Sequence, residues 1–316
     1  MFLEGACSFD KEGRSLFPWR FVMHVNLTFS VIVTQLVNGF ALGMLFTLMA
    51  VGLTIILGLM RVINFTHGIL YTLGAYTVIT LQKFLGFWPM LAIAPACVGL
   101  LGIAIEASMI RPIYKRDPLH TLLLTFGVAL VLEDVIRLIW GDVPYPMTSP
   151  QILSGVVNLG VAYFSKYRIF VIIFTSVLLF GVWYFLERSQ LGKTILAGTF
   201  DREMVVTLGI KIDLLFTLVF GIGAGLAAIA GVLASPIRGV FPPMGTDIIM
   251  PSFVVVIIGG MGSFWGAVIG GLLVGIVKSF TVEIYSPMAD VIVFFLLAIV
   301  LLIRPRGISG IEGLLE

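Results

Sequence analysis

The chain has 316 residues, of which 59% are hydrophobic and only 11% charged, and its mean hydropathy is +1.12. Because soluble domains carry about 25% charged residues, this composition predicts an integral membrane protein. The formal net charge of +2 argues against a nucleic-acid partner, and two cysteines, Cys7 and Cys97, imply no disulfide framework.

Nine apolar runs follow one another along the chain, separated by polar loops. A spanning helix needs roughly 20 apolar residues, whereas the strands of a membrane barrel are short and alternate. We therefore expect an all-α, polytopic transmembrane bundle with eight or nine membrane segments. It forms one membrane domain over residues 1–316, with residues 1–30 as an N-terminal segment. The seventh and eighth runs are short and glycine-rich, which predicts broken or re-entrant segments. The runs lie at about 33–59, 69–85, 89–110, 119–139, 169–186, 214–235, 249–258, 267–280 and 291–303.

Lysine and arginine residues gather in alternate loops, and in short loops they mark the cytoplasmic side of a membrane. The loops expected there hold Arg111, Lys115, Arg116, Arg188, Lys193, Arg202, Lys211, Arg304 and Arg306. The opposite loops hold only Lys166, Arg168 and Arg238, and apolar residues at 156–161 predict a strand or hairpin in one of them. This assignment places the N-terminus outside, although basic residues among its first twenty positions favour the other side.

Small residues recur four positions apart in several runs, and in lipid such pairs let helix backbones approach closely. We expect them to pack helices within the bundle or against a partner subunit. The pairs are Gly39 with Gly43, Gly221 with Gly225, Gly266 with Gly270, and Gly271 with Gly275. Among charged residues, Glu106 is expected to reach the interface or pair with a basic neighbour. Glu133 is expected to pair with Arg137, four positions on.

A polar block, Asn64-Phe65-Thr66-His67-Gly68, interrupts the first two apolar runs. Polar groups at membrane depth are costly and tend to pair or to line a cavity. Two interpretations stay open: a polar turn in which Asn64 and His67 bond local backbone groups, or a place near the translocation path for Asn64, Thr66 and His67. A metal site is not expected, because the three histidines of the chain lie far apart in the sequence.

A second break carries glycines at 259, 260, 262 and 266. Such a segment cannot sustain a stable helix interior, which favours a hinge or a junction between half-helices. We assign Gly259 and Gly260 to the translocation path. Asp247 is added to that path, because its carboxylate follows Gly245-Thr246 on the outer side, where it could face a ligand ammonium group.

Residues 187–213 form a polar excursion between two apolar runs. We expect a helix from about Phe200 to Leu208, capped by Thr199 and ended by Gly209. Met204, Val205 and Leu208 would share one side of it, and such a projecting amphipathic helix needs something soluble to lie against. Gly192-Lys193-Thr194 resembles the end of a phosphate-binding loop, but Glu187 stands where the earlier glycine is required. No ATP site is therefore expected on this chain.

Taken in order, these motifs resemble permease subunits of ATP-binding-cassette importers for branched-chain amino acids, and the LivH-type subunit more than its LivM-type partner. The likeness covers about residues 36–308 and rests on residues 38–68, 191–210 and 259–271, with Arg111-Pro112 after Glu106. This chain departs from the family pattern in Thr66, Val205 and Val206, where alanine is common, and in Lys193, where arginine is frequent.

The resemblance implies that residues 187–213 are a cytoplasmic coupling loop, in which a short helix docks on an ATPase. ATP and Mg would bind on those ATPase subunits, and no cofactor on this chain. Further implied partners are a second permease subunit (LivM-like or a copy), a periplasmic or extracellular solute-binding protein, and the lipid of a bacterial cytoplasmic (inner) membrane. Transport would proceed by alternating access. The residues carried over to the coupling role are Phe200, Asp201, Arg202, Glu203, Met204, Val205, Leu208 and Gly209.

The alternative is an ion-coupled secondary transporter, in which the glycine-rich segments would form a midplane site and buried carboxylates would bind the ion. An enzyme is not expected, because no nucleophile–base pair or metal arrangement can be assigned. The solute expected for the importer is a branched-chain amino acid or a related small polar solute.

Overall fold

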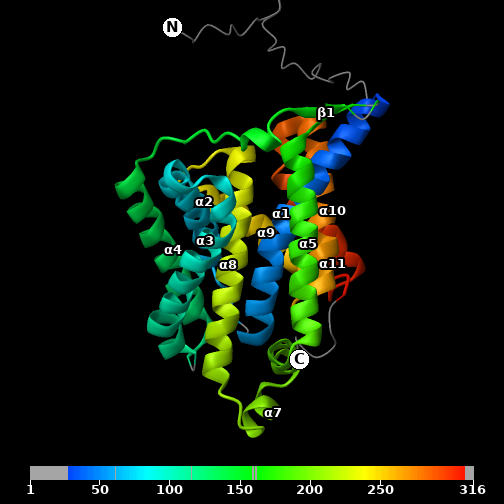
Figure 1. Cartoon of the computed structure of the whole chain (residues 1–316). Helices are drawn as coiled ribbons and strands as arrows, with labels where there is room; N and C mark the ends of the chain where they lie inside the picture. Colours follow the sequence, from blue (N-terminus) through cyan, green and yellow to red (C-terminus); the bar gives the residue numbers. More distant parts are fainter. Residues whose placement is uncertain (1–27, 61, 115, 159, 161, 310–316) are drawn as a thin grey trace, which may run out of the picture.

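The computed structural model describes residues 28–60, 62–114, 116–158, 160 and 162–309. Within these ranges the chain is helical apart from one short hairpin, which confirms the all-α class (Figure 1). The predicted N-terminal segment lies almost wholly outside the described residues.

Eight of the nine predicted apolar runs lie within one α-helix each, and the third, 89–110, covers most of a further α-helix and the π-helical turn that follows it. These helices are α1 (Phe29–Met60), α2 (Thr66–Leu85), α3 (Phe87–Ile105), α4 (Pro118–Trp140), α5 (Lys166–Arg188), α8 (Ile212–Arg238), α9 (Met244–Gly259), α10 (Phe264–Tyr285) and α11 (Val291–Ile303). Two further helices, α6 (Gln190–Phe200) and α7 (Arg202–Thr207), fill the polar excursion. The remaining turns are a π-helical turn η1 (Glu106–Ile110) and the 3-10 turns η2 (Arg111–Ile113), η3 (Gln151–Leu153) and η4 (Ser286–Met288).

In the part of the chain that the structure describes, five helical segments are long and apolar enough to cross a membrane, so the expected count of eight or nine is not confirmed. They are Phe29–Met60, Phe87–Ile113, Lys166–Arg188, Ile212–Arg238 and Phe264–Met288. The 16 residues of α9 span about 24 Å, less than the ~30 Å of a hydrocarbon core, as expected for a broken segment. The same expectation is wrong for α10, because its 22-residue helix continues past the apolar run to Tyr285.

The core is built around α1 and α8, which lie in the middle of the bundle (Figure 1). Glycines let α10 lie directly on α1: a Cβ added at Gly275 would lie 2.3 Å from the Cα of Gly43, and one added at Gly39 would lie 2.7 Å from the Cα of Ile276. Gly221 and Gly225 similarly face α3 at Ile103 and Pro95. The prediction that these glycine pairs pack helices within the bundle is confirmed.

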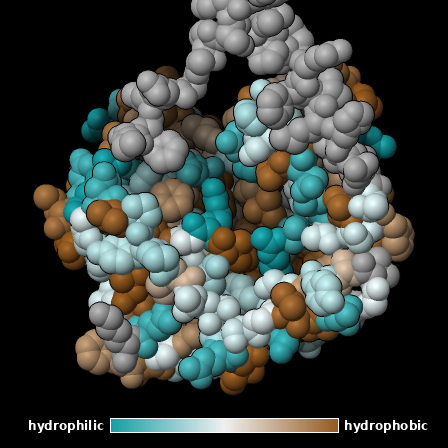
Figure 2. Space-filling view, turned by 90° about the horizontal axis from the view of Figure 1, so that it is seen from above, coloured by the Kyte–Doolittle hydropathy of each residue, from teal (hydrophilic) through white to brown (hydrophobic). Residues whose placement is uncertain are grey.

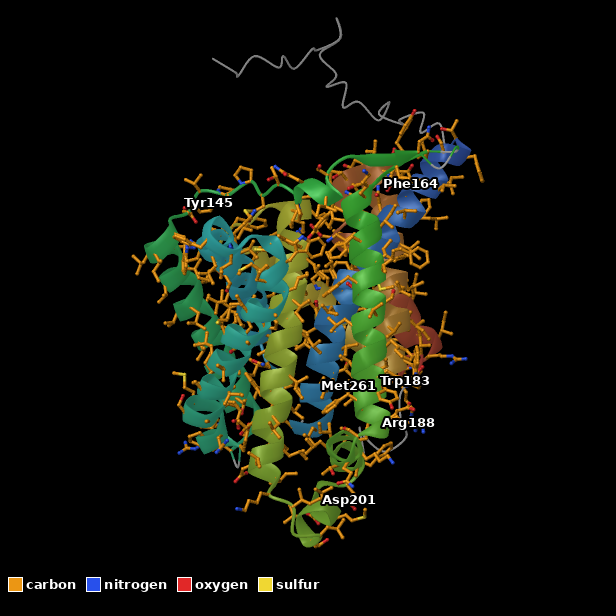
Figure 3. All side chains as sticks on the ribbon, in the orientation of Figure 1. Tyr145, Phe164, Trp183, Arg188, Asp201 and Met261 are labelled. Carbon is orange, nitrogen blue, oxygen red and sulfur yellow. The ribbon has the colours of Figure 1, made fainter. Side chains whose placement is uncertain are left out.

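The two ends of the bundle differ. One end carries the antiparallel hairpin of β1 (Val156–Asn158) and β2 (Tyr163–Ser165), in which Val157 lies opposite Phe164. This confirms the predicted strand or hairpin, although Leu159 and Val161 lie outside the described residues. The other end carries α6 and α7. Figure 3 shows Tyr145 and Phe164 at the hairpin end, and Arg188 and Asp201 at the α7 end.

Candidate functional site

The polar excursion folds as two short helices at one end of the bundle: α6, which packs against α5 and α1, and α7. Ser189 caps α6, since its hydroxyl oxygen accepts a hydrogen bond from the Gly192 N–H at 2.9 Å. Gly192 lies where a Cβ would be 2.2 Å from the Phe185 carbonyl oxygen, so only glycine fits this sharp turn between α5 and α6. Asp201 then caps α7 by accepting from the Met204 N–H at 3.0 Å.

The predicted helix boundaries are wrong here, and the predicted cap as well. Thr199 lies inside α6, where its hydroxyl donates to the Leu196 carbonyl at 2.7 Å. Phe200 ends α6, and Asp201 takes the capping role because its backbone is extended (φ −143°) and its carboxylate reaches the first turn of α7. The expected termination is confirmed: Gly209 has φ +80°, which favours glycine.

The apolar surface of α7 also differs from the prediction. Val205 is only 1% exposed, so it does not share an open face with Met204 and Leu208. Because α7 is only six residues long, it turns Val205 toward the body of the chain. The side chains left outside are Phe200 (62% exposed), Met204 (51%), Val206 (49%) and Leu208 (68%). We call these four residues the α7 patch; they lie where α7 projects beyond the ends of the long helices (Figure 1). Asp201 and Glu203 add carboxylates beside them.

The block at Asn64–Gly68 is held by backbone bonds of its own turn and by side-chain contacts with neighbouring helices. Thr66 starts α2, and its hydroxyl donates to the Thr125 carbonyl at 3.0 Å. His67 is fully buried, with its Nε2 3.2 Å from the Met49 carbonyl on α1. The buried Asn64 side chain has no hydrogen-bond partner among the described residues. The polar turn is present, since the His67 N–H donates to the Asn64 carbonyl at 3.4 Å, but among the described residues neither side chain bonds the local backbone. The place of these residues on a translocation path stays a prediction.

The other residues assigned to that path lie elsewhere. Gly259 and Gly260 end α9, and a Cβ at Gly259 would lie 2.4 Å from the Gly266 backbone. The carbonyl of Gly259 also accepts from the Ser309 N–H at 3.0 Å, so this break joins α9, α10 and the C-terminal stretch. Asp247 lies 4.0 Å from Arg238 and lines a side cavity of about 230 Å³. Phe65 and Gly68 of the polar block line the same side cavity as Asp247, whereas Gly259 and Gly260 are not among its lining residues.

A buried polar network lies between η1 and α8. The carboxylate of Glu106, fully buried, is 3.1 Å from Arg111 and accepts from the hydroxyl groups of Thr217 (2.8 Å) and Tyr114 (2.6 Å). Burial, together with the hydrogen bond to Glu106, raises the pKa of Tyr114 above its ordinary value. Pairing of Glu106 with a basic neighbour is confirmed, as is the Glu133–Arg137 ion pair at 2.6 Å. This network fastens the α3–α4 connection to α8.

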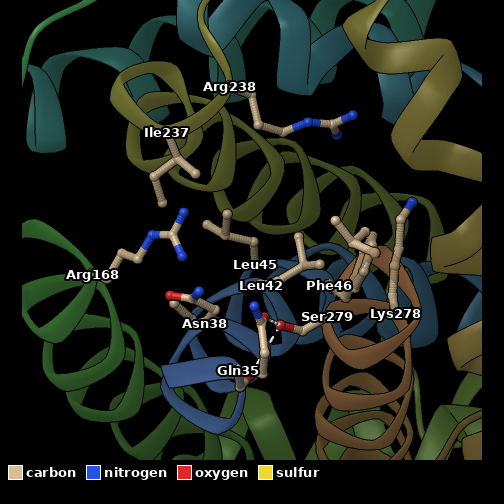
Figure 4. Close-up of a pocket in the computed structure, with 12 residues that line it drawn as sticks. Gln35, Asn38, Leu42, Leu45, Phe46, Arg168, Ile237, Arg238, Lys278 and Ser279 are labelled. Atoms are coloured by element: carbon tan, nitrogen blue, oxygen red, sulfur yellow. Dashed lines mark hydrogen bonds between the residues drawn. The ribbon is translucent and has the colours of Figure 1, made fainter. Parts of the chain in front are cut away.

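A cavity of about 270 Å³ opens at the hairpin end, where Figure 2 shows hydrophilic side chains around a hollow. Four long helices contribute to it: α1, α5, α8 and α10 (Figure 4). Polar and cationic groups (Gln35, Asn38, Arg168, Arg238, Lys278 and Ser279) share it with an apolar wall of Ala41, Leu42, Leu45, Phe46, Ile237 and Val282. We call it the outer cavity.

Sequence reasoning missed the outer cavity, because its walls come from positions more than 240 residues apart. Ser279 on α10 donates to the Gln35 side chain on α1 at 2.7 Å, across a sequence separation of 244. The only signal in the sequence is the set of polar residues at the ends of apolar runs. Of these, Arg168 and Arg238 were used only as markers of topology.

Comparisons with known proteins place the chain in context. Residues 35–302 match the family described as branched-chain amino acid transport system / permease component. The chain is 33% identical to the high-affinity branched-chain amino acid transport system permease protein BraD of Pseudomonas aeruginosa, over 87% of this chain and 95% of that protein. Identity to the permease protein LivH of Escherichia coli is also 33%, over 87% and 94%. Identity to LivM of Escherichia coli is 24%, over 84% and 68%. No solved structure matches.

Proposed function

The chain belongs to the family of permease components of branched-chain amino acid transport systems, and from that premise we propose that it is the membrane-spanning subunit of an ATP-driven importer. Its solute is a branched-chain amino acid or a related small polar solute. The family match favours this function over ion-coupled secondary transport. The nine helices that hold the predicted apolar runs then supply eight or nine membrane segments, with α9 as a broken one.

The distribution of cations supports a direction for the bundle. Among the described side chains, the short loops of the α7 end have five cations and those of the hairpin end three. The five are Arg111, Arg116, Arg188, Lys193 and Lys211, and the three are Lys166, Arg168 and Arg238. Positively charged short loops stay in the cytoplasm, so the α7 end faces the cytoplasm and the hairpin end faces outward. The membrane is the bacterial cytoplasmic (inner) membrane.

The single observation that carries the coupling role is the α7 patch. Four apolar side chains, 49% to 68% exposed, project beyond the membrane helices on the capped helix α7 and on the residues next to its ends. Outside lipid, such a patch is stable only when a protein surface covers it. An apolar helix face seated in a groove, with carboxylates at its rim, is an established way for proteins to dock. We assign this groove to a separate ATPase subunit, which holds ATP and Mg.

Two further partners complete the importer. A second permease subunit, LivM-like or a copy of this chain, supplies the other side of the path; the similarity to both LivH and LivM supports such a pair. A solute-binding protein delivers solute at the hairpin end. Closure of the ATPase pair moves α6 and α7, and the sharp turn at Gly192 passes this motion to α5. The bundle then alternates between outward and inward access.

Transport in proteoliposomes tests this function. The chain is reconstituted with its co-purifying permease and ATPase subunits, with binding protein and labelled leucine on the hairpin side. We expect uptake that needs hydrolysable ATP and persists when an uncoupler dissipates ion gradients. Uptake by this chain alone, or uptake abolished by the uncoupler at constant ATP, would refute an ATP-driven importer.

A further inference from the structure

The outer cavity contains one cation, Arg168, whose charge no side chain of the described residues matches. Lys278 lies 2.6 Å from Asp290, and Arg238 lies 4.0 Å from Asp247. Arg168, by contrast, makes neither an ion pair nor a hydrogen bond with any residue in the described ranges. Its side chain is half-buried and extends from the first turn of α5 toward the cavity, close to Asn38 (Figure 4). A partly desolvated guanidinium without a partner is costly, and a carboxylate is the ligand that best fits its planar fork.

The wall around this guanidinium is suited to an aliphatic group. Leu42, Leu45 and Phe46 face the cavity from successive turns of α1, and Ile237 and Val282 face it from α8 and α10. A volume of about 270 Å³ is just below the range of roughly 300–1,000 Å³ that is usual for small-molecule sites. It is therefore suited to a small solute rather than to a peptide.

A polar corner lies at the edge of this wall. The Gln35 amide N–H₂ donates to the Glu283 carboxylate at 2.6 Å, and its amide oxygen accepts from Ser279 at 2.7 Å. Together with the Asn38 side chain, these groups offer acceptors to an ammonium group. The Arg168 cation, the apolar wall and these hydrogen-bond acceptors match the carboxylate, the side chain and the ammonium group of an aliphatic α-amino acid, in that order.

A second cavity, of about 360 Å³, gives a route from outside. It shares Asn38, Arg168 and Ile237 with the outer cavity, and Phe164 and Ser165 of the hairpin line its far side. Arg168 therefore lies at the boundary between the two cavities. A solute that enters beside the hairpin meets this guanidinium first.

We infer that the outer cavity is a solute-binding site of this subunit, in which Arg168 binds the carboxylate of an aliphatic amino acid and Leu42, Leu45 and Phe46 cover its side chain. The inference rests on the proposed function for the choice of solute. It adds a site within this chain and a residue that selects for the carboxylate.

Binding to the purified full-length chain in nanodiscs tests the site, with leucine and leucinamide as probes and no binding protein present. Leucinamide lacks only the carboxylate, so we expect it to bind wild type at least about tenfold more weakly than leucine, the loss of one charge-assisted interaction. In Arg168→Gln, leucine should bind as weakly as leucinamide. Lys166→Gln, which removes an exposed cation two residues away that does not line the cavity, should behave as wild type.

Three results would overturn the inference: equal affinities of wild type for the two probes, unchanged leucine binding in Arg168→Gln, or an effect of Arg168→Gln confined to docking of a binding protein. The first comparison needs no variant, so it stands even where Arg168→Gln does not fold. ATP-driven uptake by the assembled complex is measured in parallel. If the complex takes up leucine with ATP but the chain binds leucine and leucinamide equally, the binding site is refuted and the proposed function stands. If the chain prefers leucine but the complex shows no ATP-driven uptake, the proposed function is refuted and the binding site stands.

Discussion

Gly275→Ala places one methyl group at the closest backbone contact between α1 and α10. The added Cβ would lie 2.3 Å from the Cα and from the N of Gly43, and 2.6 Å from the carbonyl oxygen of Gly39. Carbon atoms pack at about 3.5–4.0 Å, so the helices must separate locally by about 1 Å or more. All three contacted atoms belong to the backbone, and no side-chain rotation relieves the overlap.

Overpacking of this kind costs about 1–3 kcal/mol, and alanine returns roughly 0.5–1 kcal/mol through its higher helix propensity. We expect Gly275→Ala to lower the free energy of unfolding by about 1–2 kcal/mol, measured by SDS titration in mixed micelles. Gly127→Ala in α4 is the matched control, because nothing lies within 4 Å of its added Cβ. Its stability should equal or slightly exceed that of wild type. Equal stability of the two variants would refute the close packing of α1 on α10.

Three further predictions concern the α7 end and the ion pairs. Asp201→Ala removes the N-cap of α7, which costs about 1 kcal/mol of helix stability. It should therefore reduce ATP-coupled transport more than Asp201→Asn, in which the side chain can still cap the helix. Equal transport by the two variants would contradict this. Glu106→Ala leaves the groups that bond its carboxylate without a partner and should lower the free energy of unfolding by about 3–5 kcal/mol. Glu133→Ala, at a more exposed ion pair, should lower it by at most about 1 kcal/mol. Similar losses in the two variants would count against the buried network. The Lys278 ammonium lowers the pKa of Asp290 through their hydrogen bond. The stability from this pair is therefore present above the ordinary aspartate pKa and is lost as pH falls through the lowered one; carboxyl NMR should show the pKa of Asp290 rising in Lys278→Met.

The nine helices could be predicted because an apolar run of membrane length has few alternatives to a helix. The glycine pairs were equally predictable, since their four-residue spacing is a local property of one helix; their partners were not. Gly43 meets Gly275 only because the fold brings the first and tenth helices together. The same limit explains why a basic partner nearby in the sequence was among the expectations for Glu106, whereas its bond with Thr217 was not.

At the α7 end, the spacing of apolar residues predicted the position of a helix correctly but assigned the wrong residues to its exposed face. Spacing of three and four residues grouped Val205 with Met204 and Leu208, as on an ideal helix. The real helix begins two residues later than predicted and has only six residues, so Val205 is buried and Val206 is exposed instead. The outer cavity was beyond sequence reasoning, because its lining comes from four helices that only the tertiary fold assembles.

The central claim, that force enters through α7, is tested most directly by retention of the ATPase subunit on the purified chain. Leu208→Asp puts a charge in the α7 patch, where the side chain is 68% exposed and its loss should not unfold the bundle. Val156→Asp makes the same kind of change at the hairpin end, on a side chain that is 59% exposed. The account predicts that Leu208→Asp loses most of the co-purifying ATPase while Val156→Asp keeps it. Equal retention by both variants would contradict the docking of a motor on α7.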